Sequence, residues 1–301
     1  MNVKVATAES SLTLPRGRVA DYFELTKPRV VLMVLVTTLA GFYLGGRSGF
    51  DLQLAVNLIV GTALAAGGTL ALNQYVERDT DALMRRTQHR PLPQMRMRPQ
   101  EALVFGASAT VAGVAYLLAT TNLLCTAVIA AVTVIYLGAY TPLKRYTWMC
   151  NLVGAIPGAL PPVAGWAAAR GSIAIEPVLL FAIMFMWQLP HTFAVARLYR
   201  TDYARAGIWL LPSDTARGGN PSNPVVIAAS LGLVALGIVP TMLGLAGIAY
   251  LVVASMLGAG MLVFGYTMVS QPGNLVAARR LLLASLVYLP IVLLVLVLDR
   301  M

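Results

Sequence analysis

The chain has 301 residues, of which 58% are hydrophobic and only 11% are charged, and its formal net charge is +10. A mean hydropathy of +0.75 lies far outside the range of soluble globular proteins, so the composition excludes a soluble enzyme and indicates an integral membrane protein. The positive charge suits the loops of a membrane protein, an anionic lipid or an anionic substrate, and we expect no nucleic-acid partner.

Apolar runs long enough to cross a hydrocarbon core of about 30 Å recur along the chain. They lie at residues 30–46, 54–72, 102–119, 123–140, 149–169, 177–196, 224–244, 246–269 and 281–298. We therefore predict an all-α fold, a polytopic membrane helical bundle of about nine transmembrane helices. Residues 30–301 would form a single transmembrane domain, and residues 1–29 would form an N-terminal cytoplasmic segment.

The basic residues are distributed unequally between the two sides of this predicted bundle. Of the 22 lysines and arginines, only Arg47, Arg170 and Arg300 fall on the side opposite the N-terminus. Because cytoplasmic loops carry the excess of Lys and Arg, we predict a multi-pass protein of the cell membrane with a cytoplasmic N-terminus. Two long polar connections, near residues 73–101 and 197–223, then lie in the cytoplasm, where we expect them to face a shared cavity.

The segment at residues 73–81 places three of the twelve acidic residues at the end of the second apolar run. Carboxylates near hydrocarbon are costly unless they are solvated, paired or bound to a cation, so this cluster predicts a site. If the second helix continues, Asn73, Glu77 and Asp81 share one face over roughly 12 Å. Such a face suits Mg²⁺, which is held by carboxylates and substrate phosphates. Asp79, about 200° from Glu77, joins it only if the helix unwinds. A solvated helix end paired with arginines is the alternative.

Basic residues stand close to these acids. Arg86 and Arg90 carry guanidinium groups, which bind phosphate through two parallel hydrogen bonds. A metal diphosphate between the carboxylates and the arginines would explain why both are present. Lys144 and Arg145 reach the same side and could bind this diphosphate, or could serve only as positive anchors at the membrane surface.

The sixth apolar run carries an ionisable side chain near its end. His191 follows Trp187 by four residues, and Asp202 lies beyond the run. On a continuous helix, Leu198 and Asp202 would each lie within about 20° of His191, although Pro190 is expected to introduce a kink. His191 could ligate a haem iron, act as a base or only hydrogen-bond within the bundle. Ionisable residues in spans are functional candidates, so we favour function.

Several of these motifs together resemble the UbiA superfamily of intramembrane prenyltransferases, and within it the branch that acts on haem. The resemblance runs from about residue 21 to residue 212. Its pieces are Asp21-Tyr22, Leu25-Thr26-Lys27-Pro28-Arg29, the acidic segment with Met84 and Arg86-Thr87, Arg90-Pro91-Leu92, Tyr140-Thr141, Leu143-Lys144-Arg145, Asn151, Gly158-Ala159, Pro161-Pro162, Gly165-Trp166, Trp187-Gln188, Pro190-His191, Asp202-Tyr203, Ala206-Gly207 and Leu211-Pro212.

This resemblance implies an enzyme that uses Mg²⁺ to transfer a farnesyl group from farnesyl diphosphate to a vinyl group of haem B, giving haem O and diphosphate. It assigns Asn73, Glu77 and Asp81 to the first Asn/Asp motif and Asp202 to the last position of the second. Glu77, Asp81 and Asp202 would then hold the metal, while His191, the distinctive residue of the haem branch, would bind haem. Trp187 lies beside His191 in the sequence motif and is assigned to haem with it.

The sequence departs from the superfamily pattern at two positions. Glu77 stands where Asp is usual, which keeps the carboxylate and lengthens its reach. Leu198 stands where many members carry the first acid of the second motif. A symmetric two-metal site with two full acidic motifs is therefore not expected.

Two other functions remain open from the sequence. A prenyltransferase for another aromatic acceptor, such as hydroxybenzoate, would share the diphosphate site and differ around His191. A non-catalytic transporter or haem-handling protein would use the acids to bind coupling ions, although here they cluster in loops on one side. The lipid bilayer, farnesyl diphosphate and haem B are the expected partners, with haem A synthase and the terminal oxidases as candidate assembly partners.

Overall fold

The computed structural model describes residues 17–46, 49–212 and 220–300, and every regular element in these ranges is helical. Most of the N-terminal segment expected at residues 1–29, namely residues 1–16, lies outside the described residues. The elements are α1(Arg18–Leu25), α2(Pro28–Gly45), α3(Leu52–Ala82), α4(Pro99–Thr120), α5(Leu123–Ile135), the π-helical turn η1(Tyr136–Tyr140), α6(Thr141–Leu143), α7(Cys150–Ala159), α8(Pro161–Arg170), α9(Ile175–Leu198), α10(Arg200–Arg205), α11(Ser222–Met242), α12(Ile248–Ser270) and α13(Leu275–Leu298).

Nine stretches of these described residues are long and apolar enough to cross a membrane, which confirms the predicted all-α membrane bundle. Seven of them are single helices. The fourth joins α5, η1 and α6 into residues 123–143, and the fifth joins α7 and α8 into residues 150–170. The fifth span breaks at Leu160 because Pro161 and Pro162 follow it, and proline interrupts the hydrogen-bond ladder of a helix.

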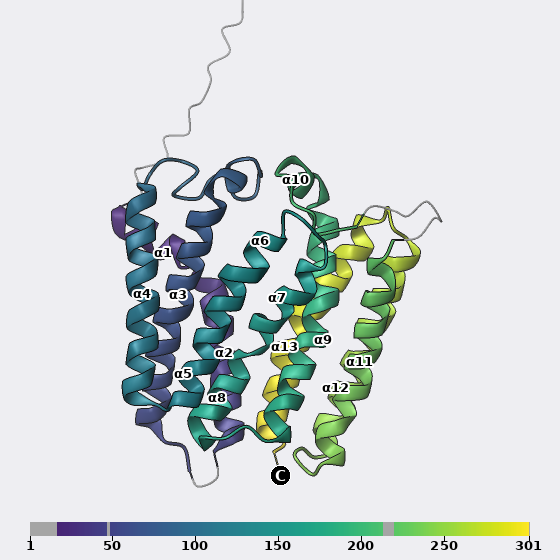
Figure 1. Ribbon diagram of the computed structural model, residues 1–301. Helices are drawn as coiled ribbons and strands as arrows, with labels where there is room; N and C mark the ends of the chain where they lie inside the picture. Colours follow the sequence, from purple (N-terminus) through teal and green to yellow (C-terminus); the bar gives the residue numbers. More distant parts are fainter. Residues whose placement is uncertain (1–16, 47–48, 213–219, 301) are drawn as a thin grey trace, which may run out of the picture.

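The spans run side by side as one bundle, with α10 at one end and the C-terminus at the other (Figure 1). α3 packs along α4, α2 packs along α8, and α9 packs against α7, α11 and α13. α2 and α8 cross closely at two glycines, because a Cβ on Gly41 would overlap the main chain of Pro162 and one on Gly165 would overlap that of Thr38. Small residues that let backbones approach are a usual basis of helix packing in membranes.

Two elements at the α10 end depart from what hydropathy alone indicates. α3 continues ten residues past the apolar run that ends at residue 72. α1 is a short helix that precedes the first span, and Arg96 of the connection between α3 and α4 forms ion pairs with its Asp21 and Glu24. Both elements are held by polar contacts with distant residues, and these contacts position the site described next.

Candidate active site

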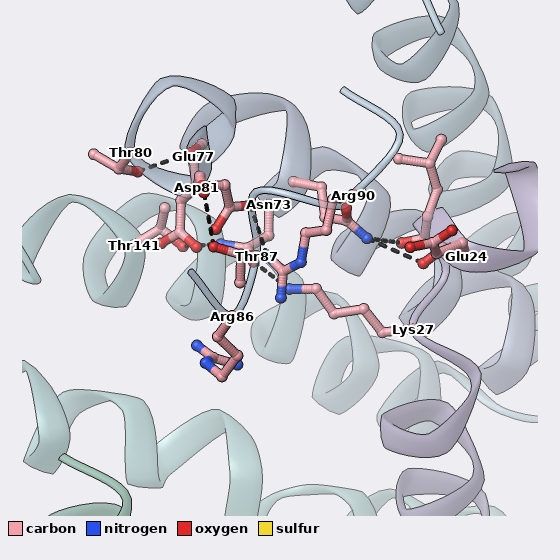
Figure 2. Close-up of polar contacts among 12 residues, drawn as sticks. Glu24, Lys27, Asn73, Glu77, Thr80, Asp81, Arg86, Thr87, Arg90 and Thr141 are labelled. Atoms are coloured by element: carbon pink, nitrogen blue, oxygen red, sulfur yellow. Dashed lines mark hydrogen bonds and ion pairs between the residues drawn. The ribbon is translucent and has the colours of Figure 1, made fainter. Parts of the chain in front are cut away.

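The acidic motif lies on one face of α3, because this helix remains continuous to Ala82. Asn73 and Asp81 are almost fully buried, with 0% and 1% of their surface exposed, and Glu77 between them is half-buried. Figure 2 shows the three side chains gathered near Lys27 and Arg90. The spacing of four residues along a continuous helix accounts for this common face.

Each of these three side chains contacts a cation from a different part of the chain. Lys27 Nζ donates to Asn73 Oδ1 at 2.7 Å. Lys144 Nζ lies 2.8 Å from Glu77 Oε1, and Arg90 Nη1 lies 2.6 Å from Asp81 Oδ2. The connection after α3 is also tied down locally, because Thr87 Oγ1 donates to the carbonyl of Asp81 at 2.9 Å. Two ion pairs and one hydrogen bond from an ammonium group to an amide therefore form a compact polar cluster, in which cations outnumber acids.

Lys27 reaches this cluster from an unusual backbone conformation. Its φ of 50° is left-handed, which costs a non-glycine residue on the order of 1 kcal/mol or more. This conformation lies at the junction between α1 and α2, directly before Pro28. Burial, reinforced by the positive charge of Arg90, lowers the pKa of Lys27 to about 7. The ammonium group is thus held where its own charge is poorly solvated, and an anionic ligand would stabilise it.

Lys144 also lines the polar cavity and follows α6, four residues after a deformed turn of the fourth span. Its Nζ lies 4.3 Å from the ring centroid of Tyr140. Although burial alone lowers the pKa of Lys144, its interactions with Tyr140 and Glu77 outweigh burial and raise that pKa well above its usual value. The deformation is the π-helical turn η1, and Thr141 links it to the acidic motif by donating to Tyr136 O at 2.8 Å and accepting from Asn73 Nδ2 at 3.2 Å. Such π-helical turns are frequent at functional sites.

Two cavities meet at this cluster. A polar cavity of about 220 Å³ contains Lys27, Asn73, Glu77, Asp81, Arg86, Arg90 and Lys144 in its wall. A second cavity of about 250 Å³ extends into the bundle and is lined mainly by apolar residues. Val30, Leu70, Tyr136 and Tyr140 border both cavities, so a charged compartment lies directly beside an apolar one. This arrangement fits an amphiphile with an anionic head and a hydrocarbon chain.

The second long connection covers the polar cavity from the other side. Asp202, on α10 and 7% exposed, accepts from the main-chain N–H of Arg86 at 3.3 Å and from Arg205 Nη1 at 3.3 Å. Arg86 Nη2 lies 3.4 Å from the hydroxyl of Tyr203, which lines the cavity. Helix α9 ends at Leu198, so α10 is a separate helix and Asp202 does not continue the His191 face. The two loops do meet at one cavity.

Two of the sequence candidates point away from the cavity. The side chain of Asp79 is 78% exposed and lies 3.6 Å from Arg78 Nη2. α3 does not unwind there, so Asp79 stays on the outer side of the helix. Arg145 is exposed and does not line the polar cavity. Neither side chain belongs to the polar cluster.

The residues present fit a magnesium ion that also takes ligands from a substrate. Glu77 and Asp81 offer carboxylate oxygens and Asn73 offers an amide oxygen to one cavity, and Mg²⁺ is usually held by one or two carboxylates with phosphates and water. In the described ranges, no group of three or more His, Cys, Asp or Glu side chains is arranged to hold a metal. Asp202 therefore does not share a ligand set with Glu77 and Asp81 in this structure.

His191 and Trp187, both on α9, line neither cavity and contact α13. His191 Nδ1 is 2.8 Å from Ser285 Oγ. The rings of His191 and Trp187 stack, with centroids 5.0 Å apart. Gln188, the neighbour of Trp187, lines the apolar cavity, so this part of α9 borders the inner compartment on one side. The haem candidates are therefore separate from the diphosphate candidates but share a helix with the cavity wall.

Lys27, Tyr136 and Tyr140 received no role from the sequence, although they form walls of the polar cavity. A signal existed for two of them. Lys27 stands directly before Pro28 at the start of the first span, and Tyr140 precedes Lys144 by four residues. Both were visible as polar residues at the ends of spans, but their convergence on α3 depends on the fold.

Comparisons with known proteins agree with this geometry. The chain is 42% identical over 289 residues to a protoheme IX farnesyltransferase of Solibacter usitatus, covering 93% of this chain and 98% of that protein. It is 40% identical over 309 residues to the protoheme IX farnesyltransferase of Koribacter versatilis, covering 98% of this chain and 99% of the relative.

Solved structures share the fold at low sequence identity. A digeranylgeranylglyceryl phosphate synthase superposes with a TM-score of 0.76 at 16% identity, covering 93% of this chain and 98% of that chain. A UbiA homologue from Archaeoglobus fulgidus bound to DMAPP and Mg²⁺ has a TM-score of 0.65 at 17% identity, covering 92% of this chain and 99% of that chain. The sequence profile described as the UbiA prenyltransferase family matches residues 34–294. The chain therefore belongs to the UbiA prenyltransferase family.

Proposed function

We propose that this protein transfers the farnesyl group of farnesyl diphosphate to a vinyl group of haem B, giving haem O and diphosphate. The observation that carries the proposal is that a charged cavity at Glu77 and Asp81 shares wall residues with an apolar cavity inside the bundle. The names of the relatives from Solibacter usitatus and Koribacter versatilis, which are farnesyltransferases of protohaem IX, support haem over hydroxybenzoate as acceptor.

The diphosphate would occupy the polar cavity, where cations surround it. Lys144 and Arg90 would exchange their contacts with Glu77 and Asp81 for phosphate oxygens, and Arg86 lines the same cavity. Lys27 adds an ammonium group beside Asn73. Positive groups that are already positioned stabilise the charge that develops on a leaving diphosphate, and they need little reorganisation to do so.

Magnesium is the proposed metal, held by the carboxylates of Glu77 and Asp81 with Asn73 beside them. Bound there, it would supply positive charge to the departing diphosphate. The bound DMAPP and Mg²⁺ of the Archaeoglobus fulgidus neighbour support this assignment. Asp202 does not lie with Glu77 and Asp81 as a third metal ligand. We propose that it contributes to catalysis by accepting a hydrogen bond from the main-chain N–H of Arg86, which positions Arg86 at the cavity.

The apolar cavity would hold the farnesyl chain and limit the access of water to the allylic carbon. Tyr136 and Tyr140 stand at its junction with the polar cavity, where the bond between carbon and phosphate oxygen would break. The terminal carbon of the porphyrin vinyl group would then attack that carbon, and a water molecule would add to the carbocation left next to the porphyrin ring. Loss of a proton from this water gives the hydroxyl group of haem O. His191 and Trp187 would bind the haem on the side of α9 that faces α13.

The proposed location is the cell membrane, with the N-terminus, the acidic motif and both long connections in the cytoplasm, and with one transmembrane domain from residue 30 onward. Arg170 and Arg300, two of the three cations predicted on the opposite side, both donate to carbonyl groups at the end of α2, away from α10. Haem A synthase and the terminal oxidases are proposed as partners because they would receive the product.

The function can be tested with membranes that contain the protein, incubated with haem B, farnesyl diphosphate and Mg²⁺. Haem O should appear by chromatography and mass spectrometry, and chelation of Mg²⁺ should abolish it. If a control enzyme makes haem O in the same assay and this protein does not, the proposal fails. Prenylated hydroxybenzoate in a parallel incubation would identify the rival acceptor.

A further inference from the structure

A buried serine on α13 is the centre of a small polar network inside the bundle. Ser285 is 0% exposed, and its hydroxyl oxygen lies 2.8 Å from His191 Nδ1. The same hydroxyl lies 2.6 Å from the carbonyl oxygen of Leu282, one turn earlier on α13. The main-chain carbonyl of Ser285 accepts from Trp187 Nε1 at 2.7 Å. One residue of α13 thus contacts both aromatic side chains proposed to bind haem.

Counting hydrogens in this network determines which nitrogen of His191 carries the proton. A serine hydroxyl has one hydrogen, and a carbonyl oxygen can only accept. The 2.6 Å approach to Leu282 O therefore requires the hydroxyl hydrogen to point at that carbonyl. Ser285 Oγ is then left with lone pairs towards His191, so Nδ1 must be the donor in this contact. A neutral imidazole has one N–H, which leaves Nε2 without a proton.

The unprotonated Nε2 is available to a ligand. Among the described residues, Nε2 has no hydrogen-bond partner. It is also not completely buried, so a ligand can reach it. Neutral imidazole with a bare nitrogen is the form that binds metal ions, and a ligating histidine usually donates its other N–H to a fixed acceptor. The hydroxyl of Ser285 is that acceptor here.

The ring of His191 is also held in orientation. Trp187 lies four residues earlier on α9 and stacks on it with an interplanar angle of 25°. Because Trp187 Nε1 is itself bonded to Ser285 O, the tryptophan cannot rotate without losing that contact. A half-turn of the imidazole about its bond to Cβ would replace Nδ1–H by the ring carbon Cδ2, so the hydrogen bond to Ser285 Oγ would be lost. Serine and tryptophan together select one orientation and one tautomer.

We propose that Ser285 is a positioning residue that keeps His191 in the Nδ1–H form and presents its bare Nε2 to the iron of the haem acceptor. The part of this inference that concerns haem rests on the proposed function. The part that concerns the tautomer is independent of it, since the network exists within the protein alone.

The tautomer can be measured directly, because the chain has only two histidines, His89 and His191. In a His89→Gln background with ¹⁵N-labelled histidine, the nitrogen shifts of His191 in detergent-solubilised protein should show a protonated Nδ1 and an unprotonated Nε2. Ser285→Ala should move the population towards Nε2–H, and Ser285→Thr, which retains a hydroxyl, should restore the original form. A protonated Nε2 in the protein that retains Ser285, or identical spectra for that protein and the Ser285→Ala variant, would overturn the inference.

A matched control exists for the loss of a buried serine hydroxyl. Ser230 on α11 is also 0% exposed, and its Oγ donates to the carbonyl of Val226 in its own helix. Ser230→Ala should leave the His191 shifts unchanged. If Ser230→Ala alters them as much as Ser285→Ala does, the effect is general loosening of the bundle and the positioning role is refuted.

The haem half is tested by titrating purified protein with haem B and recording the Soret band and the electron paramagnetic resonance of the ferric iron. Ser285→Ala should weaken haem B binding about tenfold, as losses of outer-shell partners of metal ligands do, and should alter the signature of imidazole ligation. Farnesyl diphosphate affinity should not change. Unchanged haem spectra and affinity in Ser285→Ala would refute the proposal that Ser285 presents His191 to the haem iron. Absence of haem binding by the unsubstituted protein would refute the proposed acceptor, while the nitrogen shifts would still decide the tautomer.

Discussion

Asp81 combines near-complete burial with direct access to a charged cavity, a combination that membrane proteins keep where a cation is to be bound. We expect Asp81→Asn to reduce Mg²⁺-dependent turnover about 100-fold or more, because an amide cannot supply the negative charge that a metal diphosphate requires. The measurement is the initial rate of haem O formation across a Mg²⁺ titration. Membrane insertion should be unaffected.

The same chemical change two residues earlier provides the control. Asp79 is exposed on the outer side of α3, so Asp79→Asn should retain nearly full activity. Equal losses of activity in Asp81→Asn and Asp79→Asn would show that any change of charge in this segment impairs the enzyme. Such a result would refute a specific role for Asp81.

Lys144 and Arg145 are adjacent cations with different surroundings, which separates phosphate binding from membrane anchoring. Lys144 contacts Glu77 and lines the cavity, whereas Arg145 is exposed outside it. We expect Lys144→Gln to lower kcat/KM for farnesyl diphosphate about 10- to 100-fold, the value of one charged hydrogen bond. Arg145→Gln should have little effect on steady-state kinetics. A larger loss in Arg145→Gln than in Lys144→Gln would reverse the assignment.

Residue spacing was enough to predict that Asn73, Glu77 and Asp81 share a face, because a helix repeats regularly along the chain. It could not predict their cation partners. Lys27 is 46 residues from Asn73, and Lys144 is 67 residues from Glu77. Such pairs depend on how the spans pack and on the left-handed turn at Lys27, neither of which leaves a local pattern in the sequence.

At the scale of elements, hydropathy identified the nine spans because lipid imposes a length and an apolar composition on each. It missed elements that other contacts stabilise. α1 is held by Arg96 and by Gln74 Nε2, which donates to the carbonyls of Glu24 and Leu25. The π-helical turn η1 and the separate helix α10 were also not visible, since both reflect packing around the cavity.

The close crossing of α2 and α8 leads to a prediction about stability. Gly165→Ala would place a methyl group against the main chain of Thr38, where no flexible side chain can yield. We expect a loss of about 1–3 kcal/mol, observed as a lower melting temperature of the solubilised protein. Gly260→Ala on α12 is the control, because a Cβ there meets nothing within 4 Å. A similar loss in both variants would indicate that helical glycines matter for a reason other than this crossing.

At the scale of the whole molecule, the nine candidate spans found among the described residues are an odd number, so they place Gly17 and Arg300 on opposite sides of the membrane. If the N-terminus lies in the cytoplasm as proposed, an alkaline phosphatase fused after residue 301 should be active and a green fluorescent protein fused there should not fluoresce. Fusions within the connection at residues 83–98 should give the opposite pattern. Fluorescence from the C-terminal fusion would invert the proposed orientation and move the acidic motif outside the cell.

The paired charges of the polar cluster also have a thermodynamic consequence. Since Glu77 and Asp81 already contact Lys144 and Arg90, a free Mg²⁺ ion must displace a cation that then has no anion to contact. A diphosphate provides that anion, so metal and substrate should each increase the affinity of the protein for the other, by the same factor. Calorimetric titrations of Mg²⁺ with and without a non-hydrolysable farnesyl diphosphate analogue measure this coupling. The protein would then bind either component weakly alone and both tightly as a pair, so free metal would compete poorly with the metal diphosphate for this site.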